Sequence, residues 1–292
     1  MTLEMTLELT PEIEFADIDS AGRRLRVEHQ WIARERTDRP LIVFLHEGLG
    51  SLSMWRDFPQ QLCDAAGGRG LVYSRPGYGR STPRASDEAW TIDFMHIQAH
   101  DLLPALLHTL GIDTATDKPW LFGHSDGGSI ALLHAARFPT RVAGTIVLAP
   151  HIKVESFGLN GIRAAREAYL HGDLKDKLAR HHADPDSAFW GWNGIWLDPT
   201  FPAWNIEAEL PNITGPLLAV QGFDDQYGTM AQIDGIARQV PQTELLKLHD
   251  CAHSPHRDQP QAVIDAASRF IRRHSTVTQS PSHHQRSPQE TP

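Results

Sequence analysis

The chain has 292 residues, with 27 Lys and Arg against 36 Asp and Glu, and a formal net charge of −9 with neutral histidines. This length can bury the core of one α/β domain with an inserted subdomain. The negative charge argues against a nucleic-acid or anionic-membrane surface, and no apolar run approaches the roughly 20 residues of a transmembrane helix. The two cysteines and the lack of a signal-peptide pattern predict a cytoplasmic protein without a disulfide framework.

The first half of the chain alternates strand and helix patterns. Residues 7–14 and 25–32 alternate polar and apolar side chains, which predicts an antiparallel edge hairpin. Continuous apolar runs predict buried parallel strands at 41–45, 70–73, 120–122 and 144–149. Helical patterns lie at 53–66, at 93–110 and directly after Ser125. This alternation predicts a mostly parallel sheet covered by helices on both faces.

The alternation stops between 151 and about 210. Two helix-like segments, 160–171 and 173–182, precede a tryptophan-rich stretch, and no apolar strand pattern occurs there. We therefore expect a helical lid at 151–210, inserted between the two parts of the core, 1–150 and 211–274. The second part contains strands at 216–222 and 243–248 and helices at 229–239 and 259–273. The polar tail, 275–292, is expected to be disordered.

The pattern Gly123-His124-Ser125-Asp126-Gly127 lies between an apolar strand and a helix. In a G-x-S-x-G turn, glycines two positions either side of the serine let strand and helix approach without side chains that collide. The turn exposes the serine hydroxyl at the sheet edge, with the N-terminus of the following helix beside it. The sequence therefore predicts Ser125 as a nucleophile.

A serine nucleophile requires a histidine base and a carboxylate that orients the histidine. Two loops that follow predicted strands contain these residue types, and both belong at the carboxyl edge of the sheet. Asp225 is favoured over Asp224 because it lies three residues after the glycine that ends its strand. In the second loop the candidates are His249, His253 and His256. His253 is favoured because small residues precede it and Pro255 bounds the next segment.

An oxyanion hole requires two backbone N–H donors. The first is expected from Asp126, and the second from the loop 46–50, where Gly48 allows close approach of the backbone. The tryptophans of the expected lid either line the substrate pocket or pack the lid onto the core, and those predicted to contact substrate are Trp190, Trp192 and Trp196.

Together these motifs resemble the α/β-hydrolase-fold proteins of the esterase, lactonase and C–C hydrolase kind, over about residues 25–272. The matching pieces are 46–50, 75–81, 123–128, 222–225 and 252–255. The resemblance implies a serine hydrolase with a Ser-His-Asp triad that forms an acyl-enzyme on a small-molecule carboxylic ester, thioester or lactone, without metal or organic cofactor. Many relatives carry an aspartate where this chain has Ser74, so a carboxylate role at that position is expected to be lost. A glycine often occupies the position of Glu47, so Glu47 is expected to place an extra acid near the mouth of the pocket and is predicted to contact substrate.

Several alternatives remain open. The chain could hydrolyse a C–C bond, or bind a ligand without catalysis on the same fold, and a homodimer is compatible with the sequence. The elbow Gly-x-Ser-Asp-Gly-Gly resembles that of valacyclovir-hydrolase-like enzymes, which favour amino-acid esters. The carboxylates of Asp126 and Glu47 either meet a substrate cation or are tied into hydrogen bonds at the helix N-terminus. The pair His181–His182 is expected at a solvent-exposed helix end.

Overall fold

The fold was analysed in a computed structural model that describes residues 12–20 and 22–275. An eight-stranded sheet forms its centre, in the order β1-β2-β4-β3-β5-β6-β7-β8. The strands are β1 (Ile13–Ser20), β2 (Arg23–Ile32), β3 (Leu41–Leu45), β4 (Arg69–Tyr73), β5 (Trp120–His124), β6 (Gly144–Leu148), β7 (Leu217–Gly222) and β8 (Thr243–Leu248). Strands β3 to β8 are parallel, while β2 is antiparallel to both β1 and β4. The predicted mostly parallel sheet is confirmed.

Burial follows the position of each strand in the sheet. Every residue of β3, β4, β5 and β6 is buried, because helices cover both faces of these central strands. Along β1, at the edge, buried and exposed residues alternate from Ala16 onward. The edge hairpin is confirmed, but β1 begins at Ile13; residues 7–11 of the strand predicted at 7–14 lie outside the described residues.

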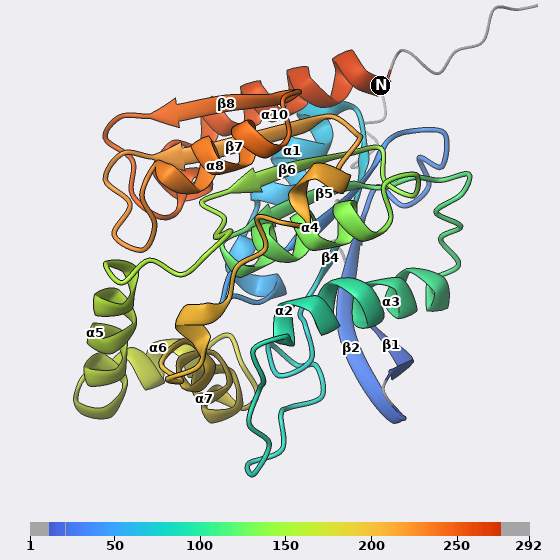
Figure 1. The fold of residues 1–292 in the computed structure, drawn as a ribbon. Coiled ribbons are helices and arrows are strands. Elements are labelled where there is room, and N and C mark those ends of the chain that lie inside the picture. The colour runs from blue at the N-terminus through green and yellow to red at the C-terminus, as the bar shows by residue number, and fades with distance from the viewer. Residues whose placement is uncertain (1–11, 21, 276–292) are drawn as a thin grey trace, which may run out of the picture.

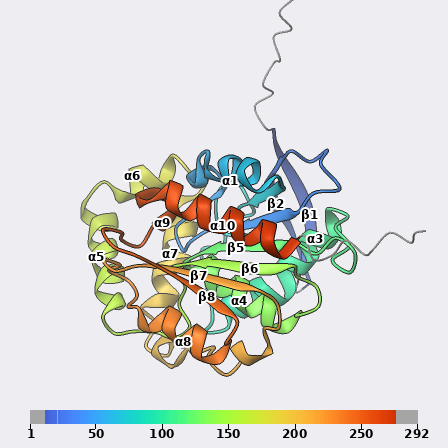
Figure 2. The ribbon, with the colours of Figure 1, turned by 90° about the horizontal axis from the view of Figure 1, so that it is seen from above.

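Helices pack against both faces of the sheet (Figure 2). One face carries α1 (Phe58–Ala66) and α10 (Pro260–Ser275), and the other carries α3 (Leu103–Thr109), α4 (Asp126–Arg137) and α8 (Ala231–Gln239). The apolar core is accordingly divided into two clusters, one on each face. The tail predicted at 275–292 lies outside the described residues except Ser275, which ends α10.

Two predicted helices are irregular in the structure, and each contains a proline. The segment predicted at 53–66 forms a 3-10 turn (Leu52–Trp55) followed by α1, whose first turn contains Pro59. The segment predicted at 93–110 forms α2 (Phe94–Ile97), a π-helical turn (Gln98–Leu102) and α3, with Pro104 in its first turn. Pro59 is accommodated in the first turn of α1, where its missing N–H has no helical partner to lose. Pro104 lies inside a backbone that stays helical from Phe94 to Thr109, and its missing N–H coincides with the π-helical turn directly before it.

Between β6 and β7 the chain forms α5 (Gly158–His171), α6 (Leu174–Ala179) and α7 (Pro185–Trp196). These helices lie at the end of the molecule toward which the parallel strands point (Figure 1). Helix α7 has a well-formed start, since the Asp184 carboxylate accepts the Ser187 N–H at 2.9 Å and Pro185 occupies the first turn. Short 3-10 turns (Phe201–Ala203 and Leu210–Asn212) lead back to the sheet, and α9 (Pro255–Asp258) precedes α10.

Candidate active site

Ser125 lies at the turn between β5 and α4 with φ +52° and ψ −121°, a strained conformation for a residue with a side chain. The two flanking glycines are required by close backbone contacts. A Cβ on Gly123 would lie 2.2 Å from the carbonyl oxygen of Gly127, and one on Gly127 would lie 2.1 Å from that of Leu45. The G-x-S-x-G spacing is thus explained by packing of the helix start against β3 and β5.

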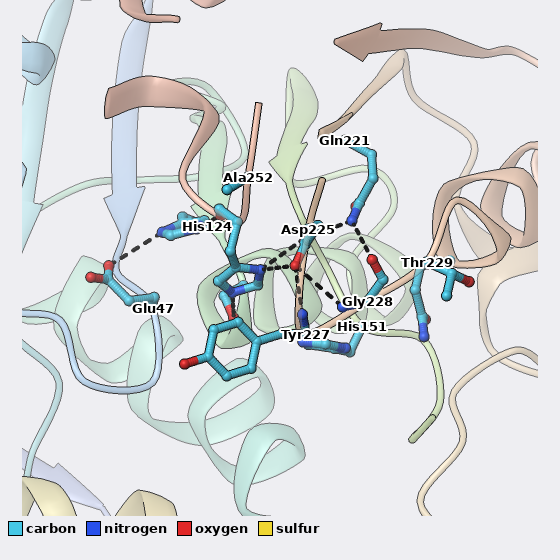
Figure 3. Close-up of polar contacts among 12 residues, drawn as sticks. Glu47, His124, His151, Gln221, Asp225, Tyr227, Gly228, Thr229 and Ala252 are labelled. Carbon is cyan, nitrogen blue, oxygen red and sulfur yellow. Dashed lines mark hydrogen bonds and ion pairs between the residues drawn. The ribbon is translucent and has the colours of Figure 1, made fainter. Parts of the chain in front are cut away.

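The structure brings together the three residues that the sequence favoured for the triad. The Ser125 hydroxyl donates to His253 Nε2 at 2.9 Å. On the other side of the ring, Nδ1–H faces both carboxylate oxygens of Asp225 at 2.9 Å (Figure 3). These contacts connect the ends of β5, β7 and β8 in one continuous chain, with His253 in the tautomer that can accept a proton at Nε2.

Asp225 is held as a carboxylate by several donors. Gln221 Nε2 donates to it at 2.7 Å, and the backbone N–H groups of Tyr227 and Gly228 donate at 2.8 and 3.3 Å. Burial alone would raise the pKa of Asp225, but the hydrogen bond and charge of His253 and the Tyr227 N–H outweigh it and lower the pKa. Gln221 was not anticipated, although a glutamine inside the apolar strand 216–222 is a visible signal.

The alternative residues lie elsewhere. The Asp224 side chain is exposed, and its backbone N–H donates to the Cys251 carbonyl. His249 stacks on the exposed ring of Phe223. His256 is buried in an aromatic cluster with Trp55 and Phe58.

A cavity of about 100 Å³ opens beside Ser125. Seven predicted site residues line it: Glu47, Gly48, Ser125, Asp126, Trp192, Trp196 and His253. The other lining residues are Leu49, His151, Ile162 and Tyr227. Helix α7 contributes Trp192 and Trp196, which are four residues apart and therefore share one helix face.

Trp190 is not among the residues that line this cavity. It lies on a different face of α7, where its ring packs against Tyr169 and Phe189, with Arg166 over it. The predicted contact between Trp190 and substrate therefore has no geometric support. The helical period explains the difference, because residues two positions apart project to nearly opposite sides of a helix.

Gly48 lies against the wall that Trp192 forms. A Cβ at position 48 would lie 2.2 Å from the indole ring of Trp192 and 3.1 Å from a carboxylate oxygen of Asp126. The absence of a side chain therefore lets the loop after β3, the start of α4 and helix α7 meet around the nucleophile.

Asp126 is fully buried, and no hydrogen bond satisfies either of its carboxylate oxygens among the described residues. Burial raises the pKa of Asp126 to about 6, and the Glu47 charge adds to this effect. The charge of Arg75 and the nearby Trp196 indole oppose it; the indole approaches without forming a well-aligned hydrogen bond. The alternative in which helix N–H groups satisfy the Asp126 carboxylate is not what the structure shows.

The Glu47 carboxylate, in contrast, has partners. Its Oε2 lies 3.3 Å from His124 Nδ1, and its Oε1 lies 3.8 Å from Arg257 Nη2. Burial raises the pKa of Glu47, but the hydrogen bond and charge of His124 outweigh this effect together with the charge of Arg257, so the pKa lies well below its usual value.

Four lining residues were not among the predicted site residues: the aliphatic Leu49 and Ile162, and the titratable His151 and Tyr227. His151 follows β6, and burial followed by the charge of His253 lowers its pKa to about 4, so its ring is neutral. Tyr227 lies two residues after Asp225, and its ring centroid is 4.7 Å from that of His253. The available signal was their position, since residues that directly follow parallel strands gather at the same edge of the sheet.

Two further expectations are corrected by buried partners. Ser74 keeps a carboxylate beside it, because its hydroxyl donates to Glu28 of β2 at 2.5 Å. His182 is buried rather than solvated, since its Nδ1 accepts the Gly79 N–H at 2.9 Å and its Nε2–H donates to the Leu49 carbonyl at 3.1 Å. Neither contact could be read from the sequence, because each joins residues more than 40 positions apart.

Across residues 12–20 and 22–275, no group of three or more His, Cys, Asp or Glu side chains is arranged to hold a metal ion. Within the same residues, no helix combines the length and the apolar character required to cross a membrane.

Comparisons with known proteins agree on the family. Residues 42–266 match the model of the "Alpha/beta hydrolase family". Among curated proteins, the chain is similar to 2-succinyl-6-hydroxy-2,4-cyclohexadiene-1-carboxylate synthase of Enterobacter sp. (strain 638), with 26% identity over 80% of this chain and 92% of that protein. It is also similar to an sn-1-specific diacylglycerol lipase of Mus musculus, with 25% identity over 80% of this chain and 81% of that one.

Solved structures share the fold. An esterase from Thermogutta terrifontis matches with a TM-score of 0.67 and 20% identity, covering 90% of this chain and 99% of that one. The enol-lactonase from Burkholderia xenovorans LB400 matches with a TM-score of 0.66 and 20% identity, covering 88% and 99%. The family match spans most of the sheet, the elbow and the loops around Ser125, and the protein is therefore an enzyme of the alpha/beta hydrolase family.

Proposed function

We propose that this protein is a serine hydrolase that cleaves a small-molecule carboxylic ester, thioester or lactone through an acyl-enzyme. The observation that carries the proposal is the unbroken chain of contacts from Ser125 Oγ through His253 to Asp225, each at 2.9 Å. This geometry supports proton removal from the serine by a neutral imidazole whose tautomer the carboxylate fixes.

In the first step, Ser125 Oγ forms a bond to the carbonyl carbon of the substrate while its proton moves to His253 Nε2. The electron pair of the C=O bond moves to oxygen, and the backbone N–H groups of Asp126 and of the Gly48 loop stabilise that oxyanion. When the C–O or C–S bond to the leaving group breaks, the leaving group takes the proton from His253. Water then repeats the sequence on the acyl-enzyme, and Ser125 recovers its proton.

The lining of the cavity favours substrates without negative charge near the scissile bond. Two carboxylates, Glu47 and Asp126, line it together with aromatic and aliphatic side chains, whereas none of its lining residues is Lys or Arg. An anionic acyl group would be desolvated beside these carboxylates without a compensating cation. This lining supports a neutral acyl group and argues against the polyanionic kind of molecule named in the Enterobacter relative.

Helices α5–α7 are proposed to act as a lid over the nucleophile. Ile162 of α5 and the pair Trp192 and Trp196 of α7 line the same cavity as Ser125. Apolar walls of this kind exclude water from the acyl-enzyme and offer aromatic surface to the substrate.

The test is covalent labelling with a fluorophosphonate probe combined with hydrolysis of a p-nitrophenyl ester. We expect labelling and turnover in the wild type and neither in Ser125→Ala. Equal labelling of both proteins would refute Ser125 as the nucleophile. Efficient cleavage of a ring-opened dienone, with no ester turnover, would assign the triad to C–C bond hydrolysis, and ligand binding without turnover would make the protein a binding module.

A further inference from the structure

His124 immediately precedes the nucleophile, and its side chain is almost completely buried, with 1% exposed. Both nitrogens of its ring face oxygen atoms. Nε2 lies 2.6 Å from the backbone carbonyl oxygen of His253, and Nδ1 lies 3.3 Å from Oε2 of Glu47 (Figure 3).

Neither of these oxygens carries a proton when Glu47 is ionised, so each contact requires an N–H on the histidine ring. A neutral imidazole has only one N–H and could satisfy one of the two acceptors. The imidazolium form satisfies both, and the Glu47 carboxylate balances its charge.

Resting on the function proposed above, we infer that His124 is a positioning residue that donates from both ring nitrogens and so joins the loop of His253 to the oxyanion loop through an ion pair with Glu47. One arm holds the backbone of His253, which supplies the base. The other arm holds Glu47, whose successor Gly48 belongs to the oxyanion loop. The ring is anchored at the end of β5, one residue before Ser125. A single rigid side chain therefore sets the positions of His253 and of the oxyanion loop relative to the nucleophile.

The surroundings favour the ionised pair. Arg257 Nη2 lies 3.8 Å from Glu47 Oε1 and adds a second cation on the far side of the carboxylate. The ring centroids of His256 and His253 lie 4.8 and 5.2 Å from that of His124. Burial, followed by the charge of His124, lowers the pKa of His256 well below its usual value, so this neighbour remains neutral.

Two other titratable groups, which line the cavity, interact electrostatically with His124. The Asp126 carboxylate on α4 interacts favourably with a charged His124, which lowers the pKa of Asp126 against the larger effect of burial. His151 after β6 is neutral for the reasons given above. Among these neighbours, Glu47 is the one whose carboxylate lies within hydrogen-bonding distance of the His124 ring.

The direct test is the protonation state of the ring, followed by ¹H–¹⁵N spectroscopy of histidine-labelled protein at pH 7. The signals of His124 are identified as those missing in His124→Gln and in His124→Asn. In the wild type we expect both ring nitrogens to be protonated. In Glu47→Gln the amide can donate to Nδ1, so we expect the ring to be singly protonated, at Nε2. A singly protonated His124 in the wild type would overturn the inference.

Kinetics tests the positioning role. His124→Gln retains a donor near the Nε2 position and therefore loses the hydrogen bond to Glu47. His124→Asn retains a donor near the Nδ1 position and therefore loses the hydrogen bond to the His253 carbonyl. Each lost charge-assisted hydrogen bond should lower kcat about 10- to 100-fold, with KM changed less than about threefold. If Glu47 acts through His124, then combining Glu47→Gln with His124→Gln should lower kcat no further than His124→Gln alone.

Glu209→Gln is the matched control, because Glu209 makes a 2.8 Å contact with His96 away from the cavity. It should leave kcat and the His124 signals unchanged. If both His124 variants keep wild-type kcat, the positioning role fails. The ring spectrum does not depend on turnover, so it separates failure of this inference from failure of the proposed hydrolase activity, which Ser125→Ala tests.

Discussion

Replacement of Asp225 by asparagine isolates the electrostatic part of the proposed triad. The carboxylate lies 2.9 Å from His253 Nδ1 through both oxygens, so its charge centre is about 4 Å from that of the imidazolium formed during catalysis. At this separation and an effective dielectric constant of about 20, the attraction is about 4 kcal/mol, which corresponds to about 10³ in rate.

The asparagine also disturbs the hydrogen bonds. An amide NH₂ in place of Oδ2 would face the Gln221 donor, and in place of Oδ1 it would face the Tyr227 and Gly228 N–H groups. In either orientation, the amide NH₂ faces an N–H donor that the carboxylate had accepted from. When the NH₂ also faces His253 Nδ1, it favours the tautomer of His253 that is protonated at Nε2, and this tautomer cannot accept the serine proton. We therefore expect kcat to fall about 10²- to 10⁴-fold.

The assay is steady-state hydrolysis of a p-nitrophenyl ester at neutral pH, with Asp224→Asn as the matched control. Asp224 is exposed, so its variant should remain within a few-fold of the wild type. Circular dichroism and the melting temperature establish that both variants are folded. Loss of activity in Asp224→Asn but not in Asp225→Asn would refute the assignment of the triad acid.

Three further predictions concern the same pocket. Ser125→Ala and His253→Ala should each lower kcat by about 10⁴ to 10⁶, and the double variant should be little worse, because the two residues act as one proton-transfer unit; additive losses would contradict this. Trp192→Ala should raise KM for aryl esters more than for acetate esters, since the indole lines the cavity; a uniform loss of activity and stability would show that Trp192 only packs the helices. Asp126→Asn should raise kcat/KM for a hemisuccinate ester relative to an uncharged ester of the same length, and should lower any preference for an amino-acid ester over its des-amino analogue; unchanged ratios would exclude Asp126 from substrate selection.

The local pattern of the chain determined much of the fold. A continuous apolar run such as 41–45 is typical of a strand buried on both faces, and the glycine spacing around Ser125 fits a single kind of strand-to-helix turn. The order of the loops that contain Asp225 and His253 was also sufficient to favour the residues that the structure places beside Ser125. These features depend on neighbours in sequence, where spacing and periodicity carry direct information.

Contacts between distant segments were decided by the tertiary structure alone. The sequence could not place Trp192 in the cavity and Trp190 outside it, because the rotation of α7 about its axis depends on packing against the rest of the molecule. It could not pair Glu28 with Ser74, or join His124 to both Glu47 and His253, since these partners lie 46, 77 and 129 positions apart. Strand order and loop conformation decide which side chains lie close together at the end of a sheet. Neither of these can be read from the local spacing of residues.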